Sequence, residues 1–182
     1  AQSFSPEELR QLGRNHAPTD IVQAVRAARE AGFENLNLDL MLGLPNQTSN
    51  QLEANIRYAL ELKPEHLSIY GLTIEPNTRF FRYHQRGLLA LPGEEAEVAM
   101  LSRAAEIAED GGYARYEISN FSQPGRECEH NLCYWRAEEY AGYGPGAVGR
   151  IGRIRRTKIK SPERFCEAIE QGQPAHFESE EL

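Results

Sequence analysis

Residues 36–42 of this chain read Leu36-Asn37-Leu38-Asp39-Leu40-Met41-Leu42, and this stretch decides the fold. Side chains of a β-strand point alternately to its two faces, so the spacing predicts a strand with leucines along one face. Asn37, Asp39 and Met41 share the other face. In a sheet built from βα units the leucines pack under helices, which leaves Asp39 facing the interior or the mouth of a barrel.

Helical patterns lie on both sides of this strand. Pro18 in a first turn, apolar residues at helical spacing and Gly32 past the end predict one helix before it. Another helix is expected to start near Ser49, after the Gly-Leu-Pro-Asn turn that breaks the strand. Near the start of the chain Ser5 is a typical helix N-cap, and Glu8 is positioned to close a capping box with it.

The rest of the chain continues the alternation of strands and helices. We expect strands over residues 66–74, 113–118, 146–151 and 154–159, helices over residues 94–109 and from Ser161 to Gly172, and a mobile acidic tail. This order is typical of parallel βαβ units. A complete (β/α)8 barrel takes about 250 residues, whereas this chain has 182. The predicted fold is therefore α/β, either an incomplete TIM-like barrel or a small open sheet.

In both architectures the carboxyl ends of the strands hold the functional site. Asp39, Thr73, Asn120 and Gly144 all fall near such ends. The carboxylate of Asp39 needs a partner there, because burial disfavours its charge. It either accepts hydrogen bonds from a ribose or an amine of a ligand, or it belongs to a buried ion pair or polar network.

Gln2 and Arg14 could both reach the mouth of the same barrel. An arginine there suits a ligand carboxylate, because its guanidinium fork makes paired hydrogen bonds. The alternative is that Arg14 is a solvated surface side chain. The glycine-rich run at residues 142–147 lacks both phosphate-loop patterns, so it either lets a flat ligand approach the backbone or is a tight turn.

Residues 130–135 read His-Asn-Leu-Cys-Tyr-Trp. This run combines an imidazole that can bind a metal with large aromatic side chains, a mixture that suits flat, conjugated, metal-bearing ligands. His130 could be a haem ligand, with Tyr134 or Trp135 packing on a porphyrin face. The alternative is a hydrogen-bonded histidine in a loop, with the aromatic side chains in the core.

A zinc site is a further alternative for the same segment. Cys128, His130 and Cys133 supply only three ligands, whereas a closed structural zinc site takes four. Cys166 would have to come from far along the chain. An array of cysteines for an iron–sulfur cluster is not present in the sequence.

Six cations fall within eleven residues: Arg150, Arg153, Arg155, Arg156, Lys158 and Lys160. They could form an anion site, for example for porphyrin propionates. Charge also protects an exposed edge strand from pairing with other chains, and we favour this interpretation.

Composition narrows the class of protein. Apolar residues make up 40% of the chain, enough for a core, and the net charge of -7 argues against general binding of nucleic acids or anionic membranes. No apolar run approaches the about 20 residues of a membrane span. Three cysteines do not make a disulfide framework, so we expect reduced thiols and a cytoplasmic protein. The chain opens at Ala1 without an initiator Met, so we expect a piece of a larger protein.

Several blocks of sequence, taken in order, resemble one family. They are Gln2-Ser3-Phe4-Ser5 with Leu12-Gly13-Arg14-Asn15-His16, Asp39-Leu40-Met41-Leu42-Gly43-Leu44-Pro45, residues 67–76, residues 116–121, Cys128 with the run from His130 to Trp135, and Gly144-Pro145-Gly146-Ala147. Together they resemble the radical S-adenosylmethionine (SAM) haem chaperones of the HemW type, relatives of oxygen-independent coproporphyrinogen III oxidase. The resemblance covers nearly the whole chain, and ordered blocks are far more specific than any one of them.

The resemblance implies a partial TIM-like barrel of the radical SAM type. Residues 1–160 would form the C-terminal part of this barrel, and residues 161–182 the start of a linker or C-terminal region. It implies a haem-binding chaperone that delivers haem to acceptor haemoproteins, and the blocks around residues 72–76 and His130 favour this branch. The alternatives are an oxygen-independent coproporphyrinogen III oxidase of porphyrin biosynthesis and a non-catalytic metal-binding module.

The resemblance also assigns residues to two cofactor sites. Residues that match the SAM site of the family are Gln2, Arg14, Asp39, Thr73 and Val148. The haem site would consist of His130 as axial iron ligand with Tyr134 and Trp135 beside it. The Cys-x3-Cys-x2-Cys motif that holds the family's [4Fe–4S] cluster lies upstream of the residues present, so we expect no radical chemistry from this chain alone. Val148 stands where chaperone relatives usually carry a histidine.

Overall fold

Strand β1 (Asn37–Leu42) has the two-faced burial that its sequence predicts. Leu38, Leu40 and Leu42 are buried, whereas Asp39 on the other face is half-buried. The alternation therefore orients the strand as expected, with its leucines in the core and its polar side chains on the opposite face of the sheet.

The computed structural model describes residues 1–181. The chain forms two compact units, Ala1–Glu127 and Cys128–Leu182. The first contains α1 (Pro6–Gln11), α2 (Pro18–Glu30), β1, α3 (Ser49–Glu61), β2 (His66–Gly71), α4 (Arg79–Gln85), α5 (Glu94–Asp110), β3 (Ala114–Arg115) and β4 (Asn120–Ser122). The second contains α6 (Glu129–Trp135), β5 (Val148–Ile151), β6 (Ile154–Lys158), α7 (Pro162–Glu170) and β7 (His176–Glu181). The domain boundary expected at residue 160 concerns the intact barrel and stays a prediction.

The sheet of the first unit has the strand order β1-β2-β4-β3. Strands β1 and β2 are parallel and α3 lies between them in the chain, so the βαβ unit predicted there is confirmed. Strand β4 is antiparallel to both β2 and β3, so the expectation of parallel units throughout is wrong. Only Ala114–Arg115 of the strand expected over residues 113–118 is a strand, and Asn120 begins β4 instead of following a strand's end. The connection between β3 and β4 is short, and a short connection joins antiparallel neighbours.

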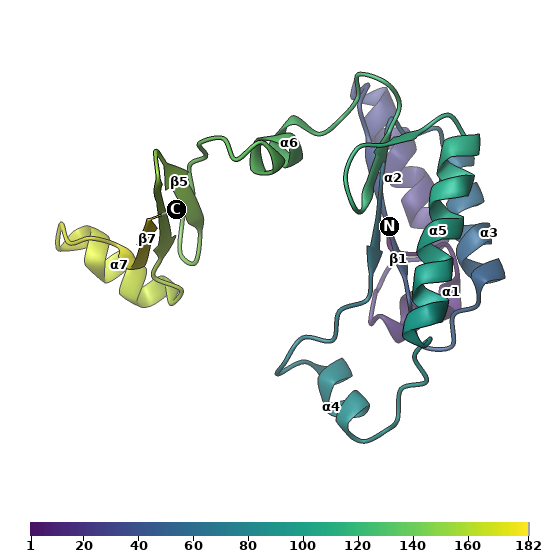
Figure 1. The fold of residues 1–182 in the computed structure, drawn as a ribbon, viewed down its shortest axis with the longest axis horizontal. Coiled ribbons are helices and arrows are strands. Elements are labelled where there is room, and N and C mark those ends of the chain that lie inside the picture. Colours follow the sequence, from purple (N-terminus) through teal and green to yellow (C-terminus); the bar gives the residue numbers. More distant parts are fainter. Residues whose placement is uncertain (182) are drawn as a thin grey trace. The chain divides into compact units, whose positions relative to one another are not determined.

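Helices α3 and α5 pack together over the leucine face of this sheet (Figure 1). Ile56 of α3 and Ala104 of α5 are fully buried there, with Leu67 and Ile69 of β2 and Phe121 of β4. Removal of these apolar side chains from water is the main favourable term for folding this unit. The helices leave the opposite face of the sheet to polar side chains.

The polar face carries a hydrogen-bonded network around His66, which is buried. The Nδ1 atom of His66 lies 2.7 Å from Oδ1 of Asn37, and its Nε2 atom lies 2.7 Å from the hydroxyl of Tyr116. The Ser68 hydroxyl donates to the same Asn37 oxygen at 3.1 Å. Because an amide oxygen only accepts, the neutral ring donates through Nδ1 and accepts from Tyr116 through Nε2.

This network predicts a pH-dependent stability. Burial lowers the pKa of His66 below its ordinary value of 6.5, and the charges of Asp39, Glu117 and Glu127 only partly oppose this. Below pH 6.5 the imidazole of His66 is therefore protonated more readily in the unfolded chain than in the folded chain. The free energy of unfolding consequently decreases as the pH falls from 6.5 toward the lower pKa of the folded state. We expect urea unfolding of His66→Gln to depend less on pH between 7 and 5 than that of the wild type. The exposed His84→Gln variant should keep the wild-type slope, and equal slopes in all three proteins would contradict the prediction.

A second buried network joins the start of the chain to helices α1 and α3. The carboxyl group of Glu8 accepts hydrogen bonds from the Ser3 hydroxyl, from Asn55 Nδ2 at 2.7 Å and from Gln47 Nε2 at 3.1 Å. Asn55 Oδ1 in turn accepts from the backbone N–H of Phe4 at 2.7 Å. Glu8 therefore does not close the predicted capping box, although Ser5 is the N-cap of α1. Buried amides compete successfully for its carboxyl group, because a buried carboxyl must be hydrogen-bonded.

The second unit is a three-stranded antiparallel sheet of order β5-β6-β7 with helices α6 and α7. The two strands expected over residues 146–151 and 154–159 are confirmed as β5 and β6. The acidic tail is not mobile as expected: residues His176–Glu181 form β7, and Arg155 pairs with Glu180 at 3.1 Å. The basic strand β6 is consequently the middle strand, so the interpretation as a protected edge is wrong. No helix within residues 1–181 is long and apolar enough to cross a membrane.

Candidate functional site

Three of the residues assigned to the SAM site lie around the free edge of β1. The backbone oxygen of Gln2 accepts a hydrogen bond from the Met41 N–H at 2.9 Å, which places the first residues of the chain beside this strand. The charges of Asp39 and of Arg14 both act at the position of Ala1. Because both side chains act on the same group, Asp39 and Arg14 lie in one neighbourhood with Gln2.

Each of these side chains is held by its own element. Gly13 takes a left-handed backbone conformation (φ 67°) after α1, and the Arg14 N–H donates to the Leu9 carbonyl at 2.9 Å. This ends the helix in the manner of a C-terminal cap and turns the exposed Arg14 away from it. Asp39 is set by the alternation of β1 and accepts from Asn37 Nδ2 at 2.7 Å.

The residues present fit a ligand that carries an amine, a carboxylate and hydroxyl groups. Oε1 of Gln2 is buried and has no hydrogen-bond partner within the described part of the chain, which is costly unless a ligand or water supplies a donor. The Asp39 carboxylate has acceptor capacity beyond its bond to Asn37. The exposed guanidinium of Arg14 offers the matching cation. Asp39 thus belongs to a polar network and keeps acceptor atoms for a ligand.

Thr73 lies two residues after the end of β2, at the carboxyl end of the parallel pair, and is exposed. The Leu72 N–H donates to the Leu42 carbonyl at 2.9 Å, so the backbone segments of β1 and β2 stay paired up to Leu72. The position at a strand's carboxyl end is the one expected from the sequence. Val148 is the first residue of β5 and belongs to the second unit.

Sequence reasoning missed the polar network that adjoins Asp39. Neither His66 nor Tyr116 was expected in this network, yet the His66 ring bonds to the Asn37 side chain through Nδ1 and to the Tyr116 hydroxyl through Nε2. The alternation of β1 already puts Asn37 on the same face as Asp39. The pairing of residue 66 with residue 37 depends on the register of β2, which the sequence does not show.

The run assigned to haem forms helix α6 in the second unit. His130 and Tyr134 are one helical turn apart, and their rings meet edge to face at a centroid distance of 4.9 Å. Tyr134 also contacts Tyr140 at 4.6 Å. Tyr134 is 48% exposed and Trp135 56% exposed, and His130 is exposed as well. The alternative that places these aromatic side chains in the core is therefore wrong, and α6 exposes an imidazole and aromatic surfaces to solvent.

The geometry does not support the zinc alternative. The three cysteines are thiols rather than parts of disulfides, and Cys133 Sγ lies 3.6 Å from the Glu139 carbonyl oxygen. Across residues 1–181, no three side chains of His, Cys, Asp or Glu converge in a way that could hold a metal ion. Cys128, His130 and Cys133 are thus neighbours in sequence without forming a tetrahedral site.

The fold and these positions define the class of protein. The radical SAM enzyme coproporphyrinogen III oxidase (HemN) of Escherichia coli superposes on 100% of this chain and 44% of its own, with a TM-score of 0.81 and 21% identity. The chain thus has an α/β fold that matches part of that TIM-like barrel. No family model matches the sequence.

Curated relatives make the assignment more specific. The heme chaperone HemW of Bacillus subtilis is 43% identical over 174 residues, which are 95% of this chain and 46% of that protein. HemW of Escherichia coli is 42% identical over 171 residues, 91% of this chain and 44% of that protein. The chain is therefore homologous to part of the HemW-type heme chaperones, and the resemblance read from the sequence is confirmed. It spans less than half the length of the relatives it matches.

Proposed function

We propose that the protein to which this chain belongs is a haem-binding chaperone of the radical SAM family, which delivers haem to acceptor haemoproteins. The observation that carries the proposal is helix α6, on which His130, Tyr134 and Trp135 are all exposed and the rings of His130 and Tyr134 are in contact. Similarity to heme chaperones along more than nine-tenths of the chain supports it. Tyr134 contacts the rings of His130 and Tyr140, and the aromatic surface that these contacts leave exposed is one that a flat iron-bearing cargo would cover.

In this proposal His130 supplies an axial nitrogen to the haem iron. Tyr134 and Trp135 offer aromatic surfaces to the porphyrin. The edge-to-face contact between Tyr134 and the His130 ring limits the orientations of the imidazole. Such a site must bind haem and also release it to an acceptor protein. An exposed site suits this role better than a buried pocket would.

The same protein would bind SAM through Gln2, Arg14, Asp39 and Thr73 of the first unit, and the assignment of Val148 rests on the resemblance of the sequence alone. With a [4Fe–4S] cluster, whose cysteine ligands are not in this chain, SAM supplies radical chemistry when both are bound. The residues present here would bind and orient it: Arg14 its carboxylate, Gln2 a donor group, and Asp39 its amine or ribose hydroxyls. The three thiols suit a reducing compartment, and we propose the cytoplasm.

Replacement of the proposed axial ligand tests the haem assignment directly. We expect His130→Ala to shift the Soret band of the haem-bound chain and to weaken haem binding by about tenfold or more, because an iron–nitrogen bond is lost. The exposed His84 lies on α4 in the first unit, so His84→Ala is the matched control and should bind haem like the wild type. An unchanged spectrum and affinity in His130→Ala would remove His130 as ligand.

An oxidase is the second candidate, favoured by the superposition on coproporphyrinogen III oxidase. The experiment that separates the two uses the intact protein with coproporphyrinogen III under anaerobic, reducing conditions. Decarboxylated product would establish an oxidase, whereas bound haem that passes to an acceptor haemoprotein without such product would establish a chaperone.

A further inference from the structure

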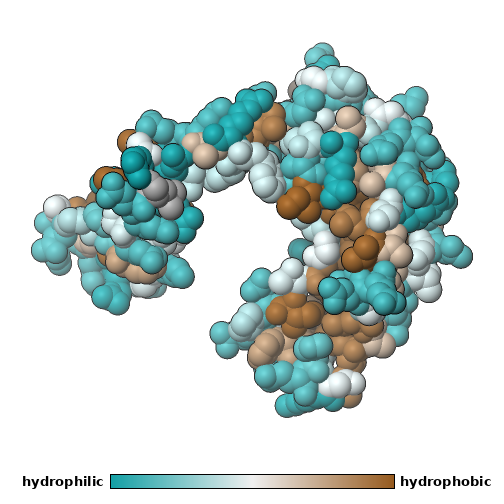
Figure 2. Space-filling view, in the orientation of Figure 1, coloured by the Kyte–Doolittle hydropathy of each residue, from teal (hydrophilic) through white to brown (hydrophobic). Residues whose placement is uncertain are grey.

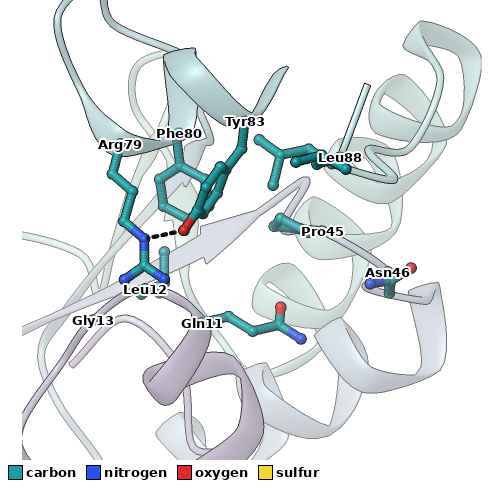
Figure 3. A pocket seen from close by; sticks show the side chains of 10 residues that line it. Gln11, Leu12, Gly13, Pro45, Asn46, Arg79, Phe80, Tyr83 and Leu88 are labelled. Atoms are coloured by element: carbon teal, nitrogen blue, oxygen red, sulfur yellow. Dashed lines mark hydrogen bonds between the residues drawn. The ribbon is translucent and has the colours of Figure 1, made fainter. Parts of the chain in front are cut away.

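The first unit contains a cavity of about 380 Å³ that none of the residues assigned to haem or SAM line. Its walls come from the end of α1, the loop after β1, helix α4 and the segment that follows α4 (Figure 3). This volume is in the range of natural small-molecule sites. Figure 2 shows apolar surface gathered where α4 faces the rest of this unit.

Most of the wall is apolar. Leu12, Pro45, Phe80, Leu88 and Leu89 line the cavity. Leu88 is 65% exposed, so part of this apolar wall is open to solvent. Transfer of an apolar ligand group from water into this cavity would therefore be favourable.

The polar groups of the cavity are few and convergent. Gln11 points into it in Figure 3, and its Oε1 atom is buried without a hydrogen-bond partner in the described residues. At the rim Arg79 Nε donates to the Tyr83 hydroxyl at 3.0 Å, and the guanidinium carbon lies 5.1 Å from the centre of the Tyr83 ring. Tyr83 thereby holds the guanidinium in place and leaves its two terminal nitrogens for a ligand.

Positive charge continues next to the cavity. Arg79, Arg82 and Arg86 surround an adjoining hollow together with Tyr83. Within residues 1–181 no carboxylate forms an ion pair with any of these three arginines. This is notable in a chain with a net charge of -7, in which carboxylates outnumber cations. An anion would thus meet several unpaired guanidinium groups beside an apolar cavity.

We infer that this cavity binds an amphipathic organic carboxylate, with its apolar or aromatic body among the leucines and its carboxylate on Arg79. The fork of the guanidinium matches a carboxylate in two parallel hydrogen bonds. Arg82 and Arg86 add long-range attraction and accommodate a second acidic group of a larger ligand. A solvated arginine face alone would not need the hydrogen bond and ring contact that hold Arg79 at the rim of the cavity.

The test uses 2-naphthoate, a fluorescent aromatic carboxylate, titrated into the full chain. We expect saturable binding that Arg79→Gln weakens by about tenfold, the loss of one bidentate charged contact. Arg26→Gln removes an exposed arginine from α2 and should leave the affinity unchanged. The neutral 2-naphthalenemethanol should bind more weakly than 2-naphthoate to the wild type and equally to both proteins. Circular dichroism must show that Arg79→Gln is folded.

Two outcomes would overturn the inference: absence of saturable naphthoate binding, or equal affinity of wild type and Arg79→Gln for the anion. Leu88→Asp is a second variant that does not depend on the arginine, since it adds a carboxylate at the cavity and should repel the anion. His130→Ala should bind naphthoate normally. A failure of the haem proposal and a failure of this one are therefore distinguishable.

Discussion

Phe121→Ala is expected to lower the free energy of unfolding of the first unit by about 3–5 kcal/mol, the cost of a cavity in place of a buried aromatic ring. The Phe121 side chain is 0% exposed and lies on the helix-covered face of the sheet, opposite Leu67 in the pairing of β2 with β4. Its ring also lies under the Arg115 guanidinium, at 5.9 Å. Neighbouring backbone cannot move to fill the space, because β4 is hydrogen-bonded to strands on both sides.

Urea unfolding followed by far-ultraviolet circular dichroism measures this effect, since helices α2, α3 and α5 of the first unit dominate the signal. Phe33→Ala is the matched control. Phe33 is 61% exposed, so its removal should change stability by no more than about 0.5 kcal/mol. If Phe121→Ala lowered the free energy of unfolding as little as Phe33→Ala does, the placement of β4 in the centre of the sheet would be wrong.

The second large effect is expected from Asn55→Leu in the buried Glu8 network. This change removes the Nδ2 donor 2.7 Å from the Glu8 carboxyl and the acceptor of the Phe4 N–H. A buried carboxyl and a backbone N–H are both left short of partners, which costs about 3 kcal/mol or more. The similar volume of leucine keeps the cost of a cavity small.

The same helix provides the control for this prediction. Asn50 is exposed near the start of α3, and Asn50→Leu should leave the unfolding free energy within about 0.5 kcal/mol of the wild type. The double variant Glu8→Met with Asn55→Leu should recover part of the loss, because neither side chain then leaves the other unsatisfied. Simple addition of the two single effects would show that Glu8 and Asn55 do not interact.

The candidate site could be predicted only in part. Thr73 follows the carboxyl end of β2 as the strand pattern predicted, whereas Asp39 lies in the middle of β1, on the predicted polar face but not near the strand's end. Gln2 and Arg14 were named from resemblance, and the structure brings both to the neighbourhood of Asp39. The arginine-lined cavity left no trace in the sequence, since its walls come from segments that are distant along the chain.

The sequence by itself determined the local structure of this protein: the leucine face of β1, the parallel β1–α3–β2 unit and the helix that begins at Ser5. Strand alternation and helix capping depend on neighbours within a few residues, so they can be read from spacing. Only the tertiary structure decided three features: the antiparallel direction of β4 in the sheet, the pairing of the acidic β7 with the basic β6, and the hydrogen bond between Glu8 and Asn55. The local sequence around each of these residues is compatible with other strand directions, pairings or hydrogen bonds. The observed ones are selected by partner residues that are distant in the sequence and come close only in the folded chain.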